Sequence, residues 1–469
     1  MTILRLCVTA LLVASLLSPA VAQQLTASTP KHDSALDVNS MDRTVDPCVD
    51  FFKYSCGGWI KNNPIPPDQS SWDTYSKMQD ENLRRLRGIL EAAAVPDAKR
   101  SAAAQKIGDY YSSCMDEKAI EAKGAEPLKT GLEQISKIDS KADIADVAAA
   151  MVHDNVLFHF DSTQDFRDAS RVIAEADQGG LGLPDRDYYV KDDAKSVELR
   201  KAYVAHVEKM FNLLGDPSET AAGEAQTVMR IETALAKGSM TRLERREPKN
   251  LDHRMTSTEF EQITPDFSWQ VYFTKVGQPS LASLNVASPN FFKALNEELE
   301  KENLADWKSY LRWHLVHADA PFLSAAFLNE NFAFYGKTLR GQQELQPRWK
   351  RCTEGVDNDL GEALGQVYVE TYFSPAAKQE AVKMVKEIDA GMEQDINSLP
   401  WMSAATKRQA LVKLHAMANK IGYPDKWRDY SKLEIVRGDE LGNVERARKF
   451  EFDRRWPKSA SRWIGASGI

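Results

Sequence analysis

The sequence predicts a mainly α-helical fold with few short strands. Apolar residues recur every three or four positions over long stretches, which is the period of an amphipathic helix. Strand signals are few and short, and RVIAEA at residues 171–176 is the best of them. With 469 residues, of which 43% are hydrophobic and 27% charged, the chain has enough material for a large core or two domains.

Two helices are expected in the first quarter of the chain. In residues 71–93 the spaced positions are Tyr75, Met78, Asn82, Leu86 and Ile89. In residues 102–116 the shared face is formed by Ile107, Tyr110, Tyr111 and Cys114. This periodicity predicts that Cys114 is buried on a helix rather than exposed on a loop.

Two further helices are expected near residue 400. In residues 380–396 one apolar stripe is formed by Val382, Val385, Ile388, Met392 and Ile396. In residues 399–424 Ser403 can cap the start of a helix, and Gly422 and Pro424 can stop it. The stripe and the caps together predict a helical pair.

The charge of the chain excludes two classes of partner. The formal net charge is −8, and the lysines and arginines are scattered. Proteins that bind phosphates of nucleic acids or anionic membranes need a basic patch or stripe. We therefore expect no nucleic-acid partner.

The first 22 residues are typical of a secretory signal peptide. Arg5 is the only charge, residues 6–17 form a short apolar run, and Ala20-Val21-Ala22 is a small-residue cleavage site. Cleavage is expected between Ala22 and Gln23. The apolar run is shorter than the roughly 20 residues of a spanning helix, but an uncleaved anchor is the alternative and the one route to a membrane. The chain is therefore expected to be exported, to the periplasm or the extracellular space.

Export bears on the cysteines that follow the signal. Residues 23–41 are polar and form a predicted flexible leader. After it come Cys48, Cys56, Cys114 and Cys352, which an oxidising compartment would normally oxidise to disulfides. Four cysteines allow three connectivities, and their spacing alone does not choose among them.

No catalytic motif is visible in the sequence. There is no G-x-S-x-G elbow, no glycine-rich phosphate loop and no pair of C-x-x-C motifs. None of the eight histidines belongs to H-E-x-x-H, which places two zinc ligands one helical turn apart. The sequence therefore predicts no catalytic, cofactor-binding or metal-ligating residue in this chain.

The nearest approach to a metal site is WHLVHAD, where His314 and His317 lie three apart on an expected helix. Two histidines at this spacing can share a metal, but zinc needs a third protein ligand and usually a general base. The favoured interpretation is two ordinary polar residues on a helix face.

Several segments, in order, resemble the neprilysin family of zinc metallopeptidases, which includes secreted bacterial oligopeptidases. They are DPCVDFFKYSCGGWIKNNPIPPDQSSW at 46–72, YYSSCMD at 110–116, GLGLPDRDYY at 180–189, RWKRCTEGVDNDLGEALGQVYVETYF at 348–373, LPWMSAATKRQAL at 399–411 and KIGYPDKW at 420–427. The resemblance runs from about Met41 to Arg455, and we expect a peptidase N-terminal domain over 42–455.

The resemblance implies a helical, two-lobed fold around an internal cavity. The family hydrolyses short peptides with a zinc-activated water. Its H-E-x-x-H, its E-x-x-x-D and its substrate-binding N-A-x-Y lie C-terminal to the segments matched here. This chain is therefore expected to form the lobe that covers the zinc site, to hold no zinc and to be inactive alone. The alternative is a secreted helical module that binds peptides or a protein without cleaving them.

The resemblance also sorts the cysteines. It implies that Cys114 pairs with Cys352. The family cysteines that match Cys48 and Cys56 pair with partners near the family's C-terminus. We therefore expect Cys48 and Cys56 to be left unpaired by truncation.

The chain departs from the family after the Cys-Gly-Gly-Trp motif. Some members carry arginines there that hold the substrate's carboxylate. Here Trp72 and Gln79 stand at those places, and the first arginine is Arg84. The resemblance therefore assigns no carboxylate-binding role to this segment.

Residues 456–469 have no helical period and do not resemble the family. A family-like continuation, LAKIGKPVDRSEWHM, can be encoded so that deletion of its first base yields every residue from Trp456 to Ile469 and then a stop codon. We therefore expect this tail to be the product of a one-base frameshift, in the gene or in its sequencing. The alternative is a natural lineage-specific C-terminus.

Overall fold

The computed structural model describes residues 37–456. The predicted signal peptide, with cleavage between Ala22 and Gln23, and the predicted frameshifted tail at 457–469 lie outside the described residues. The chain divides into two compact units at Pro64 and Ile65. Each unit is described by itself.

The described part of the first unit, residues 37–64, holds the 3₁₀-helix η1 (Val38–Ser40) and helix α1 (Phe51–Asn62). Asp50 caps α1 by accepting a hydrogen bond from the Lys53 backbone N–H. Gly58 lets α1 approach the chain before it closely, because a Cβ there would lie 2.5 Å from the Asn39 carbonyl oxygen. The Cys-Gly-Gly-Trp motif therefore has a packing role.

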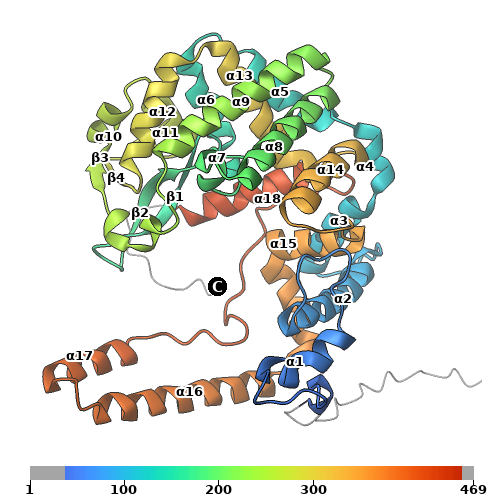
Figure 1. Cartoon of the computed structure of the whole chain (residues 1–469), viewed down its shortest axis with the longest axis vertical. Coiled ribbons are helices and arrows are strands. Elements are labelled where there is room, and N and C mark those ends of the chain that lie inside the picture. Colours follow the sequence, from blue (N-terminus) through green and yellow to red (C-terminus); the bar gives the residue numbers. More distant parts are fainter. Residues whose placement is uncertain (1–36, 457–469) are drawn as a thin grey trace, which may run out of the picture. The chain divides into compact units, whose positions relative to one another are not determined.

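The second unit is mainly helical (Figure 1), so the predicted fold class is confirmed. The longer helices are α2 (Thr74–Ala94), α3 (Ala102–Met115), α8 (Ala194–Leu213), α9 (Ser218–Gly238), α12 (Pro289–Lys301), α13 (Leu304–Asp319), α15 (Arg348–Tyr372), α16 (Pro375–Ser398), α17 (Ala404–His415) and α18 (Glu440–Arg455). The shorter ones are α4 (Glu117–Lys123), α5 (Lys129–Ser136), α6 (Ile144–Ala150), α7 (Asp187–Val190), α10 (Ser257–Ile263), α11 (Trp269–Lys275), α14 (Ala325–Asn331) and the π-helix η8 (Phe332–Leu339).

Short 3₁₀-helices connect several of these elements. They are η2 (Glu126–Leu128), η3 (Lys141–Asp143), η4 (Val152–Asp154), η5 (Glu244–Arg246), η6 (Pro248–Asn250) and η7 (Ala320–Phe322). Within residues 37–456, no helix combines the length and the apolar character that crossing a bilayer requires.

One small mixed sheet interrupts the helices, in the order β1-β2-β4-β3. The strands are β1 (Phe158–Gln164), β2 (Val172–Gln178), β3 (Arg254–Thr256) and β4 (Ser283–Val286). The pairs β1–β2 and β3–β4 are antiparallel, whereas β2–β4 is parallel. The RVIAEA segment, the best strand signal in the sequence, forms most of β2.

The larger hydrophobic core fills the space between the sheet and the helices from α5 to α14. Aromatic side chains dominate its centre. Phe158 of β1 packs with ring-centroid distances of 5.2 Å to Trp269 and 5.1 Å to Tyr272, and Trp269 contacts Phe260 at 4.2 Å. Each of these side chains is at most 1% exposed, so this core supplies most of the apolar burial of the unit.

A second core lies between α2, α3, α15 and α18. The predicted face of α3 is confirmed, because all four of its residues are buried. The predicted face of α2 is partly wrong: Leu86 is buried, but Tyr75 is 82% and Met78 62% exposed. Helix α2 instead buries Leu83 and Leu90, because α3 and α15 pack on a face rotated from the one that the apolar spacing favoured.

The helical pair near residue 400 forms as α16 and α17, and Ser403 caps α17 as predicted. Helix α17 ends at His415, before the expected stop at Gly422 and Pro424. The stripe on α16 is largely uncovered: Ile396 is its only buried member, and Ile388 is 61% exposed. The periodicity identified the helix correctly, but within the described residues no element covers most of its apolar side.

Helix α15 is tied to the segments before it by a disulfide and a buried ion pair. Cys114 of α3 and Cys352 of α15 form a disulfide, with their Cα atoms 5.6 Å apart. Two residues before Cys352, the Lys350 Nζ lies 2.9 Å from Asp68 Oδ2 and 2.7 Å from Asp80 Oδ1. Lys350 is only 8% exposed, so both carboxylates act on a largely desolvated ammonium.

Replacing Lys350 by Met should destabilise the protein strongly. The change leaves the Asp68 and Asp80 carboxylates buried without their cation, and breaking a buried pair costs about 3–5 kcal/mol. The midpoint of urea unfolding, followed by fluorescence, measures the loss.

The matched control is Lys449→Met, because Lys449 pairs with Asp453 on the surface of α18 with 67% of its side chain exposed. Such a pair contributes at most about 1 kcal/mol. Equal midpoints for the two variants would contradict a structural role for Lys350.

Candidate functional site

The histidine pair of WHLVHAD lies beside a buried carboxylate, Glu232 of α9. Glu232 is 0% exposed and accepts hydrogen bonds from Tyr189 at 2.7 Å and Tyr203 at 2.8 Å. Trp313 Nε1 donates to it at 3.2 Å. The His314 Nε2 lies 3.1 Å from Glu232 Oε1. Glu232 is thus a polar hub inside the larger core, and its partners supply the hydrogen bonds that a buried carboxylate requires.

The other histidines of this region pack against aromatic rings. His317 stacks on Trp313 with a centroid distance of 5.2 Å, and burial lowers the pKa of His317 to about 3. His206 stacks on Phe334 at 5.0 Å, and its Nδ1 lies 3.0 Å from Glu330 Oε1. Burial likewise lowers the pKa of His206. These imidazoles are held neutral in the core.

His314 lies on α13, the helix that the sequence predicted, but the face that carries it is buried, because His314 is only 4% exposed. Its surroundings do not suit zinc. Glu232 already accepts bonds from tyrosines and Trp313, and His317 faces aromatic rings. In residues 37–456, no three His, Cys, Asp or Glu side chains are placed to hold one metal ion. We therefore derive no metal chemistry from these residues.

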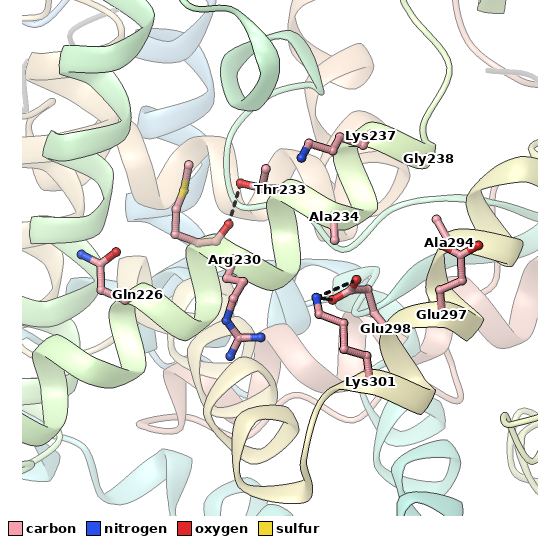
Figure 2. Close-up of a pocket in the computed structure, with 11 residues that line it drawn as sticks. Gln226, Arg230, Thr233, Ala234, Lys237, Gly238, Ala294, Glu297, Glu298 and Lys301 are labelled. Atoms are coloured by element: carbon pink, nitrogen blue, oxygen red, sulfur yellow. Dashed lines mark hydrogen bonds and ion pairs between the residues drawn. The ribbon is translucent and has the colours of Figure 1, made fainter.

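A groove of about 630 Å³ lies between α9 and α12. Figure 2 shows Arg230 and Lys237 of α9 on one side and Glu298 and Lys301 of α12 on the other. Lys301 Nζ donates to Glu298 at 3.1 Å, and Arg230 pairs with Glu302. Because its central charges already neutralise one another, the groove offers no clear charge for a ligand.

A second groove, of about 660 Å³, lies beside the N-terminal half of α2. Gln79 lines it together with Tyr75 and Met78, and Tyr368 of α15 forms another part of its wall. Gln79 is one of the two places where some family members carry arginine, and Trp72 precedes the groove. At position 79 the wall therefore presents an amide, whereas the guanidinium in this groove belongs to Arg85, about one and a half turns further along α2.

The described part of the first unit contains the two free cysteines. Cys48 is exposed and Cys56 is half-buried on α1. The backbone N–H of Cys48 donates to Asp46 Oδ1 at 2.8 Å. Two aromatic side chains near them are uncovered, Phe51 at 69% and Phe52 at 68% exposure. Adjacent large apolar side chains with this much exposure are unusual on the solvent-facing surface of a monomeric protein.

Helices α16 and α17 and the residues flanking α17 also leave large apolar side chains uncovered, and we call this set the α16–α17 apolar surface. Its members are Met384, Ile388, Met392, Trp401, Val412 and Met417, with exposures from 48% to 74%. A groove of about 450 Å³ runs along α16, where Val382 lies among Lys378, Lys383 and Lys386. Apolar surface of this kind marks a binding face or an aggregation liability.

Sequence reasoning missed a cluster of charges around Arg448 of α18. Arg448 Nη1 donates to Asp154 at 3.0 Å and to Asp319 at 3.1 Å. Asp319 is 2% exposed. These residues come from η4, α13 and α18, which lie far apart in the chain, so no local motif could have indicated the cluster.

Comparison with known proteins identifies the family. A family model for an N-terminal domain, described as Peptidase family M13, matches residues 47–424. Mouse endothelin-converting enzyme 1 is 30% identical over 417 residues, which are 86% of this chain and 53% of that protein. Neprilysin-3 of Drosophila melanogaster is 29% identical over 411 residues, 83% of this chain and 52% of that protein. The chain thus spans about half the length of these curated relatives.

Solved structures agree. The crystal structure of the Mycobacterium tuberculosis zinc metalloprotease Zmp1 with an inhibitor is 31% identical, with a TM-score of 0.84 over 92% of this chain and 67% of that one. The PepO structure from Lactobacillus rhamnosis, at 21% identity and a TM-score of 0.74 over 87% of this chain and 67% of that one, shares the fold. The resemblance seen in the sequence is confirmed: this chain belongs to peptidase family M13, the neprilysin-like zinc metallopeptidases, and corresponds to its N-terminal part.

Proposed function

We propose that this chain is the non-catalytic N-terminal portion of an exported zinc metalloendopeptidase that acts on short peptides, and that it is inactive alone. One observation carries the proposal: the family's N-terminal pattern matches 47–424, whereas H-E-x-x-H occurs nowhere in the 469 residues. The zinc ligands and the general base then belong to a portion of the protein outside this sequence. We place the peptidase N-terminal domain at 42–455.

The uncovered apolar side chains support the proposal. The α16–α17 apolar surface and the exposed Phe51 and Phe52 would cost free energy if they stayed in water. In the proposed whole protein, the catalytic portion covers at least part of this surface. A fragment without that portion should aggregate, because large apolar patches remain open.

The free cysteines fit the same proposal. Cys48 and Cys56 are free, whereas Cys114 and Cys352 are paired within the chain. In an exported protein two accessible thiols are unusual, because the compartment is oxidising. We propose that their partners belong to the catalytic portion, and that the signal peptide at 1–22 is removed between Ala22 and Gln23.

Restoring one base at codon 456 should produce a working peptidase. The expected protein continues in the family-like frame through H-E-x-x-H, whereas the chain of 469 residues lacks that motif. Both versions are expressed for export and assayed with an internally quenched fluorogenic peptide. Cleavage by the repaired protein alone, abolished by a chelator and restored by zinc, is the expected result.

Two controls sharpen this test. In the repaired protein, the H-E-x-x-H glutamate is changed to Gln, which should remove activity but not the fold. The chain of 469 residues is dialysed and its zinc content measured, with less than stoichiometric metal expected. If the repaired frame meets a stop codon before any H-E-x-x-H, the peptidase proposal fails. Capture of peptides without cleavage would then favour a binding module.

A peptide map without reductant should link Cys114 to Cys352 and leave Cys48 and Cys56 open to alkylation or to intermolecular crosslinks. Dimers on non-reducing gels should vanish with reductant and in the variant with Cys48→Ser and Cys56→Ser. The repaired protein should show neither thiol, because both acquire partners. A link from Cys114 or Cys352 to Cys48 or Cys56 would contradict the assignment.

A further inference from the structure

Helix α18 is fastened to the rest of the second unit through Arg448. The guanidinium bridges Asp154 at the end of η4 and Asp319 at the end of α13, and its Nη2 also donates to the Ala318 carbonyl oxygen at 3.3 Å. The guanidinium lies 5.5 Å from the centroid of the Phe322 ring. Figure 1 shows α18 passing next to β1 within this unit.

The cluster has more carboxyl groups than cations. Asp154 and Asp319 share the one guanidinium, and the Asp359 carboxylate of α15 also acts on Arg448 electrostatically. Asp359 accepts a hydrogen bond from Tyr110 at 2.5 Å, which ties the cluster to α3. Two carboxylates that share one site repel one another, so the site favours retention of a proton on one of them.

We propose that Arg448, Asp154 and Asp319 form a proton-controlled latch, which holds α18 firmly while one of the two carboxyl groups keeps a proton and loosens α18 when that proton is lost. Loss of the proton does not unfold α18, because Leu441, Val444 and Phe452 stay packed in the two cores. It only lowers the free energy needed to open the helix. The inference depends on this chain alone and does not require that the proposed peptidase function is correct.

The pKa of each carboxyl agrees with this geometry. Burial, reinforced by the charge of Asp154, raises the pKa of Asp319 to about 7, and burial also raises the pKa of Asp154. At the start of α18, burial raises the pKa of Glu440 to about 8. A carboxyl whose pKa is raised by folding stabilises the closed state fully below its unfolded pKa of about 4. That stabilisation is lost as the pH rises through about 7 for Asp319 and about 8 for Glu440.

Other titratable and charged groups face the latch from every side. They are His314 beside Asp154, Glu445 and Asp439 on or beside α18, Arg348 and Arg351 beside Glu440, and Lys449, Asp453 and Asp161 around His153. Burial lowers the pKa of His153 to about 4, so His153 opposes the carboxyls only below its unfolded pKa of about 6.5. Above that pH, His153 no longer offsets the pH dependence that the carboxyl groups give to the opening of α18.

A polar groove reaches the Arg448 side of the latch. This groove of about 350 Å³ is lined by Arg448 and Asp359 and bordered by His153, Asp161 and Arg455. Asp154 and Asp319 are not among its lining residues, so a proton reaches this carboxyl pair through transient opening of the cluster beside the groove.

Hydrogen exchange of α18 peptides in the full chain tests the latch. After correction for intrinsic exchange rates, the opening constant of α18 should rise by at least about tenfold between about pH 6 and about pH 8.5. Asp319→Asn mimics the protonated carboxyl permanently, so the rise of the opening constant between the two pH values should be about tenfold smaller than in the wild type. Peptides from α12 provide the internal reference.

The matched control is Asp453→Asn on the same helix, whose exposed carboxylate pairs with Lys449 and which should keep the wild-type rise. If Asp319→Asn does not fold, Asp154→Asn provides the same measurement on the other carboxyl. A rise that is unchanged in the folded Asp319→Asn or Asp154→Asn variant, or absent from the wild type, overturns the proposal.

Discussion

The link between α3 and α15 is the constraint on which the second core depends. The disulfide joins residues 238 positions apart, and Lys350 adjacent to it binds Asp68 and Asp80 in a desolvated site. Closing so long a loop restricts the unfolded chain, an effect of up to about 5 kcal/mol in the chain-entropy model. The covalent bond fixes which helices meet, and the buried ion pair fixes the loop that leads into α2.

With α15 held in this way, side chains from α3 and α18 interact with the irregular centre of this helix. Leu360 departs from helical geometry, with φ −128° and ψ 26°. The neighbouring Asp359 accepts a hydrogen bond from the Tyr110 hydroxyl of α3. Arg448 then reaches back from α18 to Asp154 and Asp319, which border the larger core. Phe322 packs against both cores. Arg448 and Phe322 therefore lie where the two cores meet, next to the buried carboxyl groups Asp154, Asp319 and Asp359, whose pKa values burial raises.

The larger core solves a different problem, the burial of a carboxylate. Glu232 is tolerated at zero exposure because tyrosine hydroxyls and an indole N–H donate to it, and because His314 lies beside it. The histidine pair that could suggest a metal site thus has structural contacts instead: His314 lies beside Glu232, and His317 stacks on Trp313. The apolar face of α16 shows the opposite case, since side chains patterned for burial remain open in the described part of the chain.

The sequence by itself determined the helical class, the strand at RVIAEA, the cap at Ser403 and the family, because periodicity, capping and ordered motifs are local properties. It did not determine which face of α2 is buried, because that depends on where α3 and α15 pack. Nor could it place His314 against Glu232, or Arg448 against Asp154 and Asp319. Those contacts join residues 82 to 294 positions apart. Only the tertiary structure decides them, because the free energy of a buried charge depends on groups that folding brings together and not on its neighbours in the chain.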